Sequence, residues 1–156
     1  MTWKAGILWL VKMNPITIRN LGPEDAAILE RVREGTFDHP VDPARAWAFL
    51  ATRVNEIVVA LDRGEVIGFA SGTVLMHPDK PTHFFVNEVG VHEDFRRQGI
   101  AARLLERIFD LARDRGCEGI WLGTEVDNEP ARALYRKLGA RETEGLVIYD
   151  WDDAEI

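Results

Sequence analysis

The apolar positions of the chain alternate between the period of a strand and the period of a helix. Short apolar, β-branched runs at residues 16–19, 56–61, 66–75, 83–92, 119–124 and 146–151 predict strands. Apolar residues three or four apart predict helices at 24–33, 100–115 and 129–138, and one more that begins at residue 43. The order β-α-α-β-β-β-α-β-α-β predicts an α/β (α+β) fold with a mixed sheet.

Caps and turns set the expected ends of these elements. Asp42 is a suitable N-cap, with Pro43 at the first helical position. Residues 62–64, Asp-Arg-Gly, predict a hairpin turn between two strands. Gly116 and Gly139 follow the last apolar positions of two helices, where glycine ends a helix well.

The composition is that of a soluble globular chain with an acidic balance. The 156 residues favour a single domain over 1–156, and the net charge is −7. This charge argues against nucleic acid and is compatible with a cationic substrate, although acidity also serves solubility alone. Cys117 is the only cysteine, so no internal disulfide is expected, and the reducing cytoplasm is the expected location.

The two ends of the chain are interpreted separately. The apolar run at residues 5–11 is too short for a membrane span and lacks a cleavage site, so we expect neither a signal peptide nor membrane insertion. Residues 1–15 are interpreted as an extension or an extra strand, and 152–156 as a frayed tail. Trp3, Trp9 and Trp151 fit either a homodimer contact or the core.

A basic glycine loop connects the strand at 83–92 to the long helix. It reads Arg96-Arg97-Gln98-Gly99-Ile100-Ala101. Gly99 permits close approach of the backbone to a ligand, and a helix start with free N–H groups favours an anion, most plausibly a phosphate. The alternative is an exposed basic helix start that pairs with nearby acids. The Gly-x-x-x-x-Gly-Lys-Ser/Thr run of nucleoside-triphosphate loops does not occur.

Two other chemistries are disfavoured by the residues. Ser71 is the only serine, and its setting is not Gly-x-Ser-x-Gly, which argues against a serine hydrolase. The four histidines have no paired ligand spacing and a single cysteine cannot form a zinc cluster, so no metal is expected.

A second stretch changes the interpretation of the loop. It contains Asn128, Ala131, Leu134, Tyr135 and Gly139 at the spacing Asn-x-x-Ala-x-x-Leu-Tyr-x-x-x-Gly. Together with Arg96, Gly99 and Ala101, this stretch resembles the GNAT superfamily of acetyl-CoA-dependent N-acetyltransferases over residues 16–151. A finer likeness, to the aminoglycoside 3-N-acetyltransferases, is based on 88–91, 96–101 and 133–139. The family often has Gly-Phe where this chain has Gly139-Ala140, a change in packing.

The resemblance implies how acetyl-CoA, as cosubstrate, would be held. The pyrophosphate would bind at the loop, and the strand backbone would pair with the pantetheine arm. The Val89 N–H would polarise the thioester carbonyl, Asn128 would bond the pantetheine and Ala131 would leave space for it. The implied binding residues are Val89, Val91, Arg96, Arg97, Gln98, Gly99, Ile100, Ala101, Ala102, Asn128, Ala131 and Tyr135.

The resemblance also implies a catalytic acid, and the chemistry requires a base. Tyr135 would protonate the leaving thiolate, although a core aromatic is the alternative. Amine acylation needs a neutral amine, so Glu88 is the candidate base, with a structural ion pair or a bond to backbone as the alternative and His83 and Asp127 as lesser candidates. Cys117 as an acetyl carrier is less favoured than Cys117 as a packing residue.

The expected function is therefore N-acetyl transfer by direct attack in a ternary complex, onto a primary amine of a small cationic molecule. The alternatives are a protein, peptide or amino-acid N-acetyltransferase and a non-catalytic acyl-CoA-binding module.

Overall fold

The computed structural model describes residues 15–151, which form two compact units, 15–121 and 122–151, each described by itself. The larger unit contains one sheet with the order β1-β2-β3-β4-β5. Its strands are β1 (Thr17–Asn20), β2 (Asn55–Asp62), β3 (Glu65–Leu75), β4 (His83–Val91) and β5 (Gly119–Trp121). Neighbours are antiparallel except β4 and β5, which are parallel. The predicted mixed sheet is confirmed.

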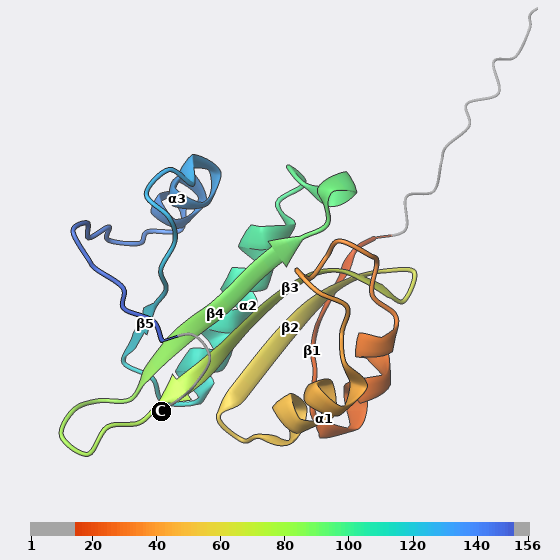
Figure 1. Cartoon of the computed structure of the whole chain (residues 1–156), viewed down its shortest axis with the longest axis horizontal. Helices are drawn as coiled ribbons and strands as arrows, with labels where there is room; N and C mark the ends of the chain where they lie inside the picture. The colour runs from red at the N-terminus through yellow and green to blue at the C-terminus, as the bar shows by residue number, and fades with distance from the viewer. Residues whose placement is uncertain (1–14, 152–156) are drawn as a thin grey trace, which may run out of the picture. The chain divides into compact units, whose positions relative to one another are not determined.

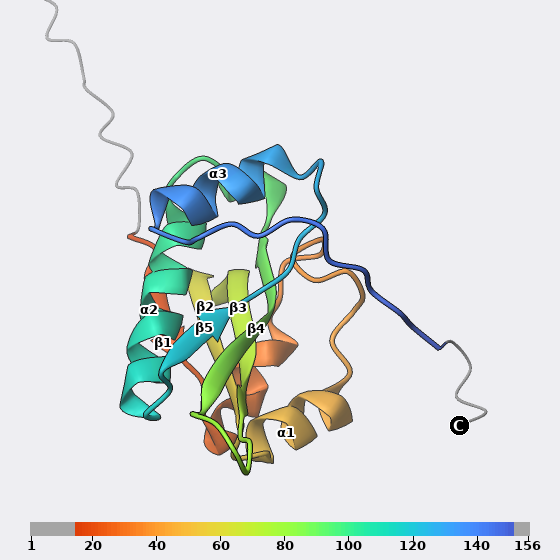
Figure 2. The same cartoon turned by 90° about the vertical axis from the view of Figure 1, so that its left-hand side faces the viewer.

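Along the chain, four helical segments lie between the strands of this sheet and one follows the last strand. They are η1 (Pro23–Glu30), α1 (Pro43–Ala51), η2 (Glu93–Phe95) and α2 (Ile100–Asp114), with α3 (Glu129–Lys137) in the smaller unit. In the larger unit α2 covers one face of the sheet, and η1 and α1 cover the other (Figures 1 and 2). No helix within residues 15–151 is long and apolar enough to cross a membrane.

Each face of the sheet buries its own apolar cluster. On the α1 face, Ile57, Val59 and Phe69 pack with η1 and α1. On the α2 face, Leu104, Leu105 and Ile108 of the helix are fully buried, and a Cβ at Gly68 would lie 3.4 Å from Leu104. The central strands β2 and β3 are therefore apolar on both sides, which explains why their sequences form nearly continuous apolar runs.

The expected caps are confirmed where the structure tests them. The Asp42 carboxylate accepts a hydrogen bond from the Arg45 N–H at 2.9 Å. Gly116 and Gly139 have φ of +72° and +88° just after α2 and α3. After α3, the Ala140 N–H donates to the Tyr135 carbonyl at 3.0 Å, which closes the last turn in the manner of a Schellman motif.

The first expected helix, at 24–33, has a different form and an earlier end. Residues 23–30 form a 3-10 helix, and Arg31 is its C-cap. The apolar positions that predicted the helix are spaced by three, which fits the 3-10 period as well as the α-helical one. The chain then extends, because the Arg33 N–H bonds the Val66 carbonyl and the Val66 N–H bonds the Arg31 carbonyl.

The two expected strands near the C-terminus are also corrected. β5 ends at Trp121 rather than at 124, and it is a largely exposed edge strand rather than a buried one. Residues 146–151 form no strand and are exposed. Apolar, β-branched composition does not make a strand unless a neighbouring strand supplies ladder partners. The expected features at residues 1–12 and 152–156 lie outside the described residues.

An extra residue in β4 changes which side chains share a face. Ser71 lies opposite Glu88, whereas the next residue of β3, Gly72, lies opposite Val86. Asn87 is therefore the additional residue of a β-bulge. Because side chains alternate along a strand, three steps from Phe85 would normally place Glu88 on the other face. The bulge instead returns Glu88 to the face that Phe85 occupies.

We predict that Gly72→Ala destabilises the larger unit by roughly 1–3 kcal/mol, because the site has no room for a side chain. A Cβ there would overlap the Phe84 ring and lie 2.6 Å from the Phe85 carbonyl oxygen. Urea unfolding measures the change. Gly123→Ala is the control, since its Cβ would meet no atom within 4 Å. Equal unfolding free energies for the two variants would refute the tight fit at the bulge.

Candidate functional site

The second half of β4 has a backbone edge that pairs with no other strand of residues 15–151. β5 pairs with β4 only opposite residues 83–85. The His92 N–H donates to the Ile67 carbonyl of β3 at 2.8 Å, so the alternation of an antiparallel ladder directs the N–H and C=O groups of Val89 and Val91 away from β3. Arg96 confirms this direction, because its Nε donates to the Val91 carbonyl from that side at 3.2 Å.

The loop after β4 presents free backbone donors. Arg97 has φ of +61° and Gly99 has φ of +74°, and the second value places Gly99 in the left-handed region as the N-cap of α2. The first helical N–H to find a partner is that of Arg103, which donates to the Gly99 carbonyl at 3.2 Å. The N–H groups of residues 97–102 have no partner among the described residues. Successive unpaired N–H groups at a helix start attract an anion.

The conformation of Arg97 is informative in its own right. A non-glycine residue in the left-handed region costs about 1 kcal/mol, and such outliers gather at ligand-binding sites. The backbone at Gly99 borders open space, because a Cβ there would meet no atom within 4 Å. The exposed Arg96 and Arg97 add positive charge to the same place. The loop therefore has the backbone, the charge and the space that a phosphate group requires.

In the smaller unit, Asn128 is the N-cap of α3. Its side-chain oxygen accepts from the Ala131 N–H at 3.3 Å, and its amide nitrogen donates to the Thr124 hydroxyl at 3.1 Å. One amide hydrogen and one lone pair of Asn128 remain for other partners. The cap explains why asparagine stands here even before any ligand is considered.

Tyr135 lies on α3, is partly buried and keeps its proton well above neutral pH. Burial raises the pKa of its phenol above the ordinary value of 10, and the negative charge of Glu125 raises it further. A phenol that is neutral at pH 7 can donate a proton, as a general acid must.

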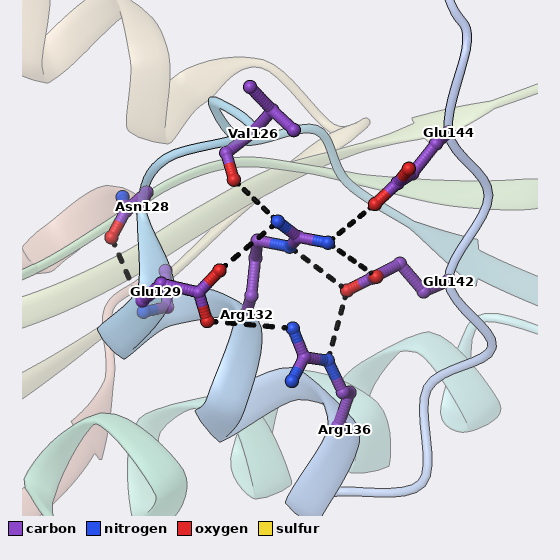
Figure 3. Close-up of polar contacts among 8 residues, drawn as sticks. Val126, Asn128, Glu129, Arg132, Arg136, Glu142 and Glu144 are labelled. Atoms are coloured by element: carbon purple, nitrogen blue, oxygen red, sulfur yellow. Dashed lines mark hydrogen bonds and ion pairs between the residues drawn. The ribbon is translucent and has the colours of Figure 1, made fainter.

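Arg132 holds α3 to the segment that follows it (Figure 3). Its guanidinium makes two bonds to the Glu142 carboxylate, at 2.7 and 3.2 Å, and one to Glu144 at 2.6 Å. It also donates to the Val126 carbonyl in the turn before the helix. Arg136 adds a bond from its Nε to Glu142 at 3.1 Å. We call these residues the Arg132 clamp.

The clamp shifts the protonation of its central acid. The hydrogen bonds from Arg132 and then from Arg136 lower the pKa of Glu142 from 4.5 to about 2. The sequence does not predict the clamp. Glu142 and Glu144 are ten and twelve residues from Arg132, and neither distance is one at which side chains of a single helix or strand meet. Only the folded turn at Gly139 brings these acids back to α3.

Glu88 is exposed rather than enclosed within the strand, and among the described residues its carboxylate makes no ion pair or hydrogen bond. Its cross-strand partner Ser71 places it on the α1 face of the sheet. A solvated carboxylate without a structural partner is available for a proton or a cation. Within residues 15–151, Glu88 makes neither the ion pair nor the backbone bond that were the alternatives to a catalytic role.

The lesser candidates have weaker positions. His83 lies six residues before Val89 on the same strand, about 20 Å away at 3.3 Å per residue, and packs over Gly119. Asp127 is exposed in the turn before α3. Burial raises the pKa of the Cys117 thiol, although Arg115 opposes this, so little thiolate is present to carry an acetyl group. No three His, Cys, Asp or Glu side chains within 15–151 gather as a metal site.

Residues 26–140 match the family model "Acetyltransferase (GNAT) family". The chain therefore belongs to the GNAT acetyltransferase family, as the resemblance of its two motifs predicted. The match includes the loop at 96–101 and the α3 stretch, and so extends over residues of both units.

Two relatives and one solved structure illustrate the likeness. The chain is 35% identical over 91 residues to N-alpha-acetyltransferase 30 of Schizosaccharomyces pombe, 58% of this chain and 61% of that protein. It is 32% identical over 127 residues to N-alpha-acetyltransferase RimI of Mycobacterium tuberculosis, 80% of this chain and 78% of that protein. An aminoglycoside acetyltransferase from an uncultured soil metagenomic sample superposes with a TM-score of 0.73 at 25% identity, covering 90% of this chain and 100% of that chain.

We predict that the stability of the smaller unit depends on pH through the protonation of Glu142. Its pKa is lowered in the folded state, so the clamp stabilises α3 above about pH 4.5, and this contribution is lost as the pH falls toward 2. A carboxyl NMR titration should give a midpoint of about 2, which moves up toward 4.5 in Arg132→Gln. Arg113→Gln, whose arginine pairs with Asp110, is the control. If the titration midpoint of Glu142 is the same in Arg132→Gln and wild type, the hydrogen bonds from Arg132 do not lower its pKa and the clamp is refuted.

Proposed function

We propose that the chain transfers an acetyl group from acetyl-CoA to a primary amine of a small cationic molecule. The observation that carries the proposal is the loop at 97–102, directly after β4. Among the residues that the structure describes, the N–H groups of this loop have no partner and the backbone edge at Val89 and Val91 pairs with no strand. One part can bind phosphate and the adjoining part can bind an extended amide chain, and acetyl-CoA contains both groups.

Each part of the donor has a matching part of the chain. The N–H groups of the loop, assisted by Arg96 and Arg97, would hold the pyrophosphate. The open edge at Val89 and Val91 would hydrogen-bond the pantetheine amides, although the Val91 carbonyl must then share its lone pairs with Arg96. The remaining amide hydrogen of Asn128 would donate to the same arm, and Ala131 would leave space beside it.

The Val89 N–H and Tyr135 would act on the reacting groups. The Val89 N–H is directed to the open edge, where it can donate to a carbonyl oxygen and stabilise the negative charge that develops on it. Tyr135 is neutral at physiological pH and would protonate the departing thiolate. The protonated Cys117 supports direct attack by the amine rather than a covalent acetyl-enzyme.

Glu88 would receive the proton that the attacking ammonium must lose. Its carboxylate lies on the α1 face, one residue before Val89, and has no competing cation among the described residues. A water molecule between the amine and Glu88 would serve as well as direct contact.

A second acceptor class, the α-amine of a protein or peptide, is favoured by a different observation. Both curated relatives described above bear the name N-alpha-acetyltransferase. The small cationic amine is favoured by the net charge of −7 and by the likeness to an aminoglycoside acetyltransferase. It is also favoured by the Glu88 carboxylate, which has no cationic partner in the described part of the chain.

We expect thiol release from acetyl-CoA when the chain is supplied with polyamines or aminoglycosides, and less with amino acids or peptides. Tyr135→Phe should lower kcat by roughly 10²-fold without abolishing CoA binding, because the proton donor is lost and the ring is kept. Tyr149→Phe, in an exposed segment, is the matched control. An unchanged kcat would remove Tyr135 from the mechanism, and no release with any amine would refute acetyl transfer.

We expect Glu88→Gln to change the pH–rate profile. If Glu88 is the base, the neutral amide cannot accept the proton that the attacking ammonium loses, and the profile no longer matches that of wild type. The measurement is kcat/KM for the best acceptor over the acidic and neutral range. Glu118→Gln, another exposed glutamate of the larger unit, should keep the wild-type profile. Identical profiles for Glu88→Gln and wild type would assign the base elsewhere.

A further inference from the structure

A row of side chains crosses four strands on the face of the sheet opposite α2. Asn55 lies opposite Thr73, Thr73 opposite Phe85, and Phe85 opposite Trp121. Directly opposed residues of neighbouring strands project to the same side of a sheet. The row therefore changes from polar groups on β2 and β3 to aromatic groups on β4 and β5, all on one face.

The members of the row are held in place by one another. The Thr73 hydroxyl donates to the Asn55 side-chain oxygen at 3.2 Å, and the Asn87 amide donates to the Thr73 hydroxyl at 3.1 Å. The rings of Phe85 and Trp121 have centroids 4.5 Å apart and are tilted by 51°. Trp121 is nevertheless 52% exposed. Its indole is thus supported by Phe85 from within the sheet and is open to a ligand from solvent.

The row lies at the point where β4 loses its strand partner. Phe85 and Trp121 are the last pair of the β4–β5 ladder, and the open edge begins with the next residue. The bulge at Asn87 places Glu88 on the same face, about 10 Å further along β4 at 3.3 Å per residue. The aromatic pair and the carboxylate are therefore two ends of one surface beside the open edge.

The chemistry of this surface selects its ligand. The face of an indole or phenyl ring attracts a cation and also packs against an apolar body. One amide hydrogen of Asn87 is used by Thr73, which leaves the other hydrogen and the side-chain oxygen for a ligand, and the Glu88 carboxylate accepts only. The surface thus offers aromatic faces and more acceptors than donors, which suits a molecule that is rich in N–H donors and positively charged.

We propose that Phe85, Trp121, Asn87 and Glu88 bind the body of the acceptor, and that this acceptor is a small organic molecule with at least two ammonium groups about 10 Å or less apart. The inference rests on the proposed function and specifies its substrate class. The amine to be acetylated lies near Glu88 and Val89, and the second ammonium lies against the Phe85–Trp121 pair. A monoamine of similar size reaches only one end of the surface.

The test compares Trp121→Ala with Ile120→Ala, using a linear diamine and a monoamine of equal chain length as acceptors. Ile120 is the neighbour of Trp121 on the same strand, and its side chain projects to the opposite face. In Trp121→Ala the KM for the diamine should rise about tenfold, while kcat and the KM for acetyl-CoA stay close to wild type. The KM for the monoamine should change little, and Ile120→Ala should leave all four constants unchanged. Trp121→Phe, which keeps a ring, should restore most of the diamine affinity.

Two different failures can be told apart. Transfer to the diamine with a KM that is the same in wild type and Trp121→Ala overturns the inference and leaves the proposed function standing. If none of the tested amines causes release of CoA from acetyl-CoA, the proposed function itself is overturned. If peptide N-termini are the best acceptors, and their KM is the same in wild type and in Trp121→Ala, the assignment of the substrate class is overturned. If Trp121→Ala does not fold, loss of the diamine-induced change in tryptophan fluorescence in Trp121→Phe decides the question, and retention of the full change overturns the inference.

Discussion

The additional residue in β4 is the constraint on which the candidate site depends. A bulge locally disrupts the ladder, and β5 pairs with β4 only as far as Phe85, two residues before Asn87. Within the described residues, the backbone groups of Val89 and Val91 therefore have no strand partner on that side. The same residue reverses the alternation of side chains, so Glu88 projects to the face opposite α2. Without Asn87, the Glu88 carboxylate would lie on the α2 face of the sheet. With it, the carboxylate lies on the opposite face, beside the open edge of β4.

The sheet separates the two ligands of the proposed reaction. The loop at 97–102 opens α2, which packs on one face, whereas Glu88 and the Phe85–Trp121 pair lie on the other. The open edge of β4 lies between these two faces, where the two ligands of the proposed reaction would meet. A ternary complex then needs no exchange of binding sites. This is the geometric reason for preferring direct attack to a covalent intermediate at Cys117.

The sequence predicted those elements whose signals are local. The caps at Asp42 and Gly116 and the hairpin at 62–64 are each fixed by a few adjacent residues, and they are found where expected. The loop at 96–101 is contiguous and was identified for the same reason. The helix at 24–33 was misjudged because a spacing of three fits two helical forms. The prediction of a strand at 146–151 was wrong because a strand forms only beside a partner strand. The residues of a segment do not show whether such a partner is available.

The rest of the site could not be found from sequence because distant residues assemble it. The row from Asn55 to Trp121 draws one residue from each of four strands, and the bulge that aligns Glu88 with it leaves no signal in the residues 85–88. The Arg132 clamp likewise joins α3 to acids beyond the turn at Gly139. It fixes the turn at Val126 and the helix that bears Asn128 and Tyr135 as one body. The clamp therefore stabilises α3, the helix that bears the proposed acid Tyr135. The motif residues of α3 thus depend on Glu142 and Glu144, which lie beyond the end of the motif at Gly139.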